Sequence, residues 1–175
     1  MSDDNDLNGL LGLCLWDLGE GTLLLCERLP QIIEDVDASP LKKELQGTIE
    51  AAAERSARYF KLTDQTHGPP NLWMTGILAD ARRDSQTIQR GVSLDIALIG
   101  AVRKMLQAER ASIETALVLA RGCHDAREHD VARLKEQCGQ NDRTLKEFLN
   151  RFARREDEFK SAGSRQVVGG GNNAW

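Results

Sequence analysis

The feature that most constrains this fold is a stretch from Ser93 to Leu119 with one carboxylate, Glu109, inside its apolar stripe. At about 100° per residue, Glu109 falls in the same arc as the apolar side chains of Leu98, Ile99, Val102, Met105, Leu106, Ile113, Ala116, Leu117 and Ala120. The stretch therefore predicts a long helix buried along one side. Because an unpaired buried charge is costly, Glu109 requires a partner inside the protein.

Composition indicates an all-helical protein of one domain. The chain has 175 residues, which is enough to bury a core, and aromatic residues make up only 5% of it. Leu, Ala, Glu, Lys and Arg dominate, and β-branched runs are few. The net charge is −4, with 23 basic and 27 acidic residues, so nothing indicates a nucleic-acid partner.

The N-terminal region predicts neither a signal peptide nor a membrane span. Its first residues are acidic and lack a basic segment, so we expect a cytoplasmic protein. Charged residues interrupt the apolar run at residues 7–29, namely Asp17, Glu20, Glu27 and Arg28. The four cysteines form no C-x-x-C pair and suggest buried thiols rather than a zinc site.

Hydrophobic periodicity and turn signals divide the chain into helices. Ser39 and Pro40 predict an N-cap and first residue for one of them, and Asn71 predicts the cap of another. Pro30 should kink or end the first helix. The predicted long helices cover residues 7–36, 40–62, 93–119 and 125–159, and a shorter one covers residues 72–88.

Four long helices with a short one between the second and third predict an all-α, ferritin-like four-helix bundle with one extended crossover. A plain up-down bundle and a helical dimer with exchanged elements fit the periodicity almost as well. The helical domain is expected to cover residues 1–160. Residues 161–175 are Gly/Asn-rich and are expected to form a flexible tail.

The sequence resembles the YciE/YciF-type ferritin-like stress proteins over roughly residues 10 to 150. Residues 95–105, followed by Glu109, Ala111 and Thr115, resemble their third helix. Residues 17–30 resemble their first helix, Leu41-Lys-Lys-Glu-Leu45 with Arg58 resembles the second, and residues 134–145 match the fourth less well. The resemblance implies a four-helix bundle that often dimerises and is related to di-iron carboxylate proteins.

The chain departs from this family at the implied metal ligands. The corresponding positions are Thr22 in the first helix, Thr48 and Ala51 in the second, Leu106 to Glu109 in the third, and Gln137 and Cys138 in the fourth. No Glu-x-x-His occurs in the sequence. We therefore expect no metal and no cofactor. The alternative is a divergent di-metal oxidase or iron-handling protein, and any remaining metal would fall to Glu109, Asp142 and Cys138.

Arg55 is the predicted partner of Glu109. It lies at the edge of the inward face of its helix, and a charge-assisted hydrogen bond would satisfy the carboxylate. Thr22 and Thr48 complete the expected structural polar centre. The alternative is that Glu109 reaches the edge of the bundle and is solvated by water.

A second apolar strip on the first helix, formed by Leu13, Trp16 and Leu24, predicts a homodimer. A helical adaptor for another protein is the alternative. His124 and Glu128 fit an ordinary polar helix start better than an ion site. The sequence has no nucleophile elbow, phosphate loop or catalytic triad, so we expect a non-enzymatic protein. A stress-related or structural role is implied only by the resemblance.

Overall fold

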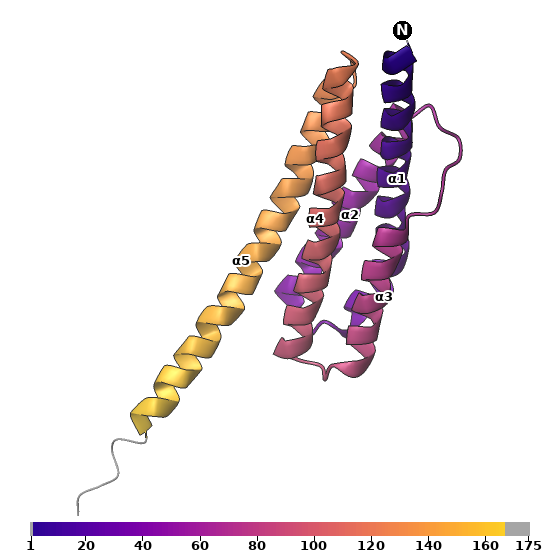
Figure 1. Cartoon of the computed structure of the whole chain (residues 1–175). Coiled ribbons are helices and arrows are strands. Elements are labelled where there is room, and N and C mark those ends of the chain that lie inside the picture. The colour runs from indigo at the N-terminus through magenta and orange to yellow at the C-terminus, as the bar shows by residue number, and fades with distance from the viewer. Residues whose placement is uncertain (1, 167–175) are drawn as a thin grey trace, which may run out of the picture.

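The structure is a computed structural model that describes residues 2–166, with side chains described for residues 6–154 (Figure 1). Its elements are α1 (Ser2–Ile32), the 3₁₀ turn η1 (Ile33–Asp35), α2 (Ser39–Leu62), α3 (Leu72–Thr87), α4 (Val92–Gly122) and α5 (Glu128–Gln166). The described residues contain no strand, and the prediction of an all-α protein is confirmed. Residues 161–166 of the expected tail belong to α5, and residues 167–175 lie outside the described part.

The four long helices pack together as a bundle. The long helix α1 packs against α2 and α4, and α5 packs against α4 and α2. The first residues of α2 and α4 lie at the same end of the bundle, because Asp95 contacts the backbone of Asp37 and Ala38. The short α3 therefore carries the chain back along α1 and α4, so that α4 runs parallel to α2 (Figure 1). This is the extended crossover that the helix count predicted.

Helix α5 differs from the other long helices because part of it has no neighbour within the described chain. It begins beside the end of α4, and its C-terminal part extends past the opposite end of the bundle (Figure 1). Its buried side chains lie in the part that faces α4 and α2, and they include Val131, Leu134, Cys138 and Leu145. The bundle core is thus closed by the N-terminal part of α5.

The helix ends follow local signals with one correction. Asn71 caps α3 as predicted, because its Oδ1 accepts the Met74 N–H at 2.8 Å. Ser39 is not the N-cap of α2: it is the first helical residue, and Ala38 precedes it without a side-chain cap. Instead, the Asp95 carboxylate of α4 accepts the N–H groups of Asp37 and Ala38, both at 3.2 Å. A residue distant in sequence thus binds the backbone that leads into α2, although it does not accept from the first N–H groups inside the helix as a serine cap would.

Leucine is the commonest residue of the core, and α1 is one of the helices that contribute most to it. By length and composition the Asp6–Asp35 segment could cross a membrane. In this fold, however, its inward face packs in the bundle, with fully buried leucines at positions 11, 15, 18, 25 and 29. The apolar character of α1 is therefore used in the core of the bundle.

Candidate functional site

Four side chains from three helices meet in the interior of the bundle. Arg55 and Tyr59 come from α2, Glu109 from α4 and Asn141 from α5. Arg55, Tyr59 and Glu109 are at most 1% exposed, so they have little access to water. We call these four residues the polar centre.

Glu109 is bound through both of its oxygens. Arg55 donates from Nε to Oε1 at 2.7 Å and from Nη2 to Oε2 at 2.9 Å. Tyr59 donates its hydroxyl to Oε1 at 3.0 Å, and Arg55 Nη1 donates to Asn141 Oδ1 at 2.9 Å. The planar guanidinium thus matches the carboxylate in the two-point geometry that makes arginine a strong partner. It also connects α2 to both α4 and α5.

The charges of this pair compensate each other. Burial alone would lower the pKa of Arg55, but the charge and hydrogen bonds of Glu109 outweigh it and hold that pKa above its ordinary value. The guanidinium therefore stays charged in the interior. Because a buried ion pair stabilises a fold only when both partners are present, the polar centre depends on Arg55 and Glu109 together.

Tyr59 should titrate only at very high pH. Burial, followed by the nearby charge of Glu109, raises the pKa of its phenol well above the ordinary value. The neutral phenol thus contributes stability below pH ~10, and that contribution is lost as the pH rises toward the folded-state pKa.

Tyr59 is the single tyrosine of the sequence, so the absorbance of tyrosinate reports on this residue alone. We expect no tyrosinate near pH 10 in the folded protein and normal titration in urea. Identical curves in the two states would contradict the burial, and Tyr59→Phe serves as the blank.

The structure brings together only part of the expected polar centre. The predicted pair of Arg55 and Glu109 forms, and Glu109 does not face solvent. Thr22 and Thr48 are buried, but each hydroxyl donates to its own helix: Thr22 to the carbonyls of Leu18 and Gly19, and Thr48 to that of Glu44. A threonine in a helix commonly satisfies its hydroxyl in this way, so neither residue needs the carboxylate.

Two members of the polar centre were not predicted. Tyr59 lies one turn after Arg55 on the inward face of α2, and its spacing of four residues was the available signal. Asn141 lies near the buried stripe of α5. Helical phase placed both residues close to the site but did not show which polar atoms would meet.

The three candidate metal ligands named from the sequence, Glu109, Asp142 and Cys138, are not arranged as a metal site. Asp142 is directed at α4, where it accepts from Arg103 Nε at 2.7 Å and from Gln107 Nε2 at 2.6 Å. Cys138 donates its thiol to the Leu106 carbonyl at 3.3 Å, and burial raises its pKa, which disfavours the thiolate that binds metals. Glu109 is bound by Arg55. Within the described residues no group of three or more His, Cys, Asp or Glu side chains has the placement of a metal site.

Trp16 has a different environment from the one predicted. Its ring makes an edge-to-face contact with Phe60, with centroids 5.3 Å apart, and it packs so closely on Gly68 that a side chain there would meet the indole. The loop at residues 63–71 thus covers Trp16 within the same chain. Leu24 packs against the core, whereas Leu13 is 43% exposed.

The charged turn before α5 is held by ion pairs. Arg121 Nε lies 2.8 Å from Glu128 Oε1, and Arg127 Nη2 lies 2.6 Å from Asp125 Oδ2. Arg127 also donates to the Leu62 carbonyl at 3.0 Å, which connects this turn to the end of α2. Glu128 thus pairs with an arginine, in agreement with an ordinary polar helix start.

Comparison with known proteins supports the fold. No family model matches the sequence, and no curated protein matches it. Among solved structures, the chain is similar to the E. coli stress protein YciF, with a TM-score of 0.78 and 16% sequence identity. The similarity covers 85% of this chain and 97% of that chain. The fold implied by the sequence resemblance is therefore confirmed.

Proposed function

We propose that this protein is a non-enzymatic, ferritin-like bundle in which the ion pair of Arg55 and Glu109 replaces metal chemistry. The observation that carries the proposal is the two-point binding of Glu109 by Arg55, with Tyr59 as a third donor. A guanidinium already supplies the positive charge that a metal ion would provide to this carboxylate. Thr22, Thr48 and Cys138, at three of the other implied ligand positions, donate hydrogen bonds to backbone carbonyls.

The proposed role of the bundle is structural or interaction-based, in a stress response. Support for the stress-related role comes from the fold it shares with YciF, which is described as a stress protein. We propose a cytoplasmic homodimer with no nucleic-acid or membrane partner. Support for the dimer comes from Leu10 on α1, which is 52% exposed, and from Leu13 one turn away, which is 43% exposed. A constant monomeric elution volume across protein concentrations would contradict it.

Metal analysis tests the metal-free proposal. Protein incubated with excess ferrous or manganous ion and then desalted should hold much less than one ion per chain. Glu109→Ala tests the polar centre, and Glu114→Ala is the matched control, since Glu114 is an exposed glutamate of the same helix. Stoichiometric metal that is lost in Glu109→Ala but kept in Glu114→Ala would overturn the proposal and favour the divergent di-metal alternative.

A further inference from the structure

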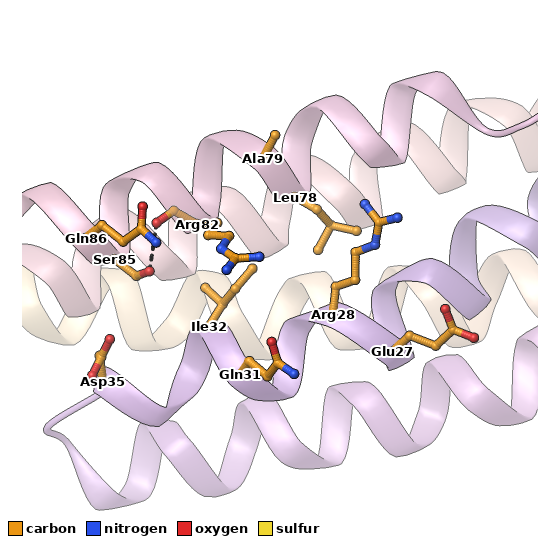
Figure 2. Close-up of a pocket in the computed structure, with 10 residues that line it drawn as sticks. All are labelled: Glu27, Arg28, Gln31, Ile32, Asp35, Leu78, Ala79, Arg82, Ser85 and Gln86. Carbon is orange, nitrogen blue, oxygen red and sulfur yellow. Dashed lines mark hydrogen bonds between the residues drawn. The ribbon is translucent and has the colours of Figure 1, made fainter.

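A groove between α1 and α3 lies outside the polar centre and is not used by the proposed function. Its volume is about 470 Å³, within the size range of small-molecule sites. It lies between the C-terminal part of α1 and the side of α3 that carries Leu78 and Arg82 (Figure 2). The lining residues are Glu27, Arg28, Gln31, Ile32, Asp35, Leu78, Ala79, Arg82, Ser85 and Gln86.

Two arginine side chains enter this groove from facing helices. Figure 2 shows Arg28 of α1 and Arg82 of α3 reaching into the same space, with Leu78 between them in this view. Within the described residues, neither guanidinium has a hydrogen-bond or ion-pair partner. The next arginine along α3, Arg83, is by contrast bound to Asp80 and Asp84. The two guanidiniums are therefore available to an outside anion.

The acidic residues of the groove do not neutralise this pair directly. Asp35 is bonded to Arg90, which comes from the segment after α3. In Figure 2 the Glu27 side chain lies at the end of the groove opposite Asp35. Within the described residues, Asp35 is thus engaged by Arg90, and Glu27 forms no ion pair with Arg28 or Arg82, so the two guanidiniums stay open to an added anion.

The floor of the groove is apolar. Ile32 and Leu78 are 5% and 2% exposed and form its base, whereas Ala79 is exposed at its edge. Gln31, Ser85 and Gln86 add polar groups at the rim. An apolar floor with a few convergent polar groups is the usual construction of a small-molecule site.

We propose that this groove binds a small organic anion, whose carboxylate or phosphate group lies between Arg28 and Arg82 and whose apolar body covers Ile32 and Leu78. Guanidinium groups bind both kinds of anion through paired hydrogen bonds, so the two head groups share one recognition chemistry. The apolar floor distinguishes such a ligand from an inorganic ion. The site lies between α1 and the crossover helix α3, and it shares no residue with the polar centre.

Calorimetric titration of the full chain with phenyl phosphate, benzoate and inorganic phosphate tests the proposal. At least one organic anion should bind more tightly than inorganic phosphate, and the tighter of the two identifies the head group. Arg28→Gln and Arg82→Gln should each weaken that binding about tenfold, since a charged hydrogen bond contributes about 1.5 kcal/mol or more. Arg83→Gln, which makes the same charge change outside the groove, should leave it unchanged.

Three outcomes would overturn this assignment. The first is that neither organic anion binds. The second is that inorganic phosphate binds as tightly as the better organic anion. The third is that Arg83→Gln lowers the affinity as much as Arg28→Gln and Arg82→Gln do. Thermal unfolding followed by circular dichroism controls for folding, because Arg28 and Arg82 are exposed and their substitution should not change stability. Binding that persists in Arg55→Met would show that the groove acts independently of the polar centre.

Discussion

Replacing Arg55 by methionine is expected to lower the free energy of unfolding by roughly 3–5 kcal/mol, because it leaves the Glu109 carboxylate buried without a counter-charge. Methionine retains much of the apolar stem, so the loss reports on the charge more than on volume. Tyr59 would then be the one remaining donor to Glu109 among the hydrogen bonds described here. Asn141 would lose its bond from Arg55 as well, which loosens the contact of α2 with α5.

Urea unfolding followed by circular dichroism measures this loss. The matched control is Arg103→Met, which removes a guanidinium from the partly exposed pair with Asp142. The Asp142 carboxylate is only 10% exposed, but it keeps the Gln107 amide as a donor and lies beside the 25% exposed Arg103 site, where water can enter, so the expected cost is about 1–2 kcal/mol. Equal losses in the two variants would contradict the special importance of the buried pair.

Asn71→Ala is expected to cost roughly 2–3 kcal/mol, a large effect for a residue outside the polar centre. Asn71 is fully buried and uses both ends of its amide: Oδ1 caps α3 at Met74, and Nδ2 donates to the carboxylate and carbonyl of Asp17, both at 2.9 Å. Loss of a cap costs about 1 kcal/mol, and the unsatisfied buried groups add about 1–2 kcal/mol. Helix α3 should lose its attachment to α1 first.

Hydrogen exchange of the α3 amides, together with urea unfolding, tests the role of Asn71. Asn71→Ser keeps an acceptor for the cap but loses the donor to Asp17, so it should recover about half of the lost stability. Leu72→Ala is the control, because Leu72 is adjacent and 74% exposed, and its effect should lie within about 0.5 kcal/mol. Unchanged exchange in α3 for Asn71→Ala would contradict this account.

The sequence predicted which side chains face the interior because residues on one face of a helix recur about every 3.6 positions. A buried carboxylate at Glu109 and an arginine at the matching phase of another helix were sufficient to predict their pairing, and the pair forms. Phase does not determine whether a hydroxyl turns inward or back to its own backbone. The hydroxyls of Thr22 and Thr48 bond to carbonyls of their own helices. The spacing of residues in the sequence does not reveal this local preference.

The environment of Trp16 could not be predicted because it depends on a loop. The segment at residues 63–71 has no periodicity, so its path over α1 was not evident. Its position is specified by contacts such as Gly68 against the indole and Asn71 against Asp17, which join residues far apart in sequence. An apolar strip on a helix shows that something covers it, but does not show whether the cover is a second chain or a loop of the same one.

The most direct test of the central claim is a double-mutant cycle in urea with Arg55→Met, Glu109→Leu and the combined variant. Each single change leaves one buried charge unpaired, whereas the combined change removes both charges. The combined variant should therefore be at least as stable as the less stable single variant, with a coupling of about 3 kcal/mol or more. Additive losses, with the combined variant less stable by the sum of the two single effects, would contradict the claim that Arg55 and Glu109 form the polar centre as a unit.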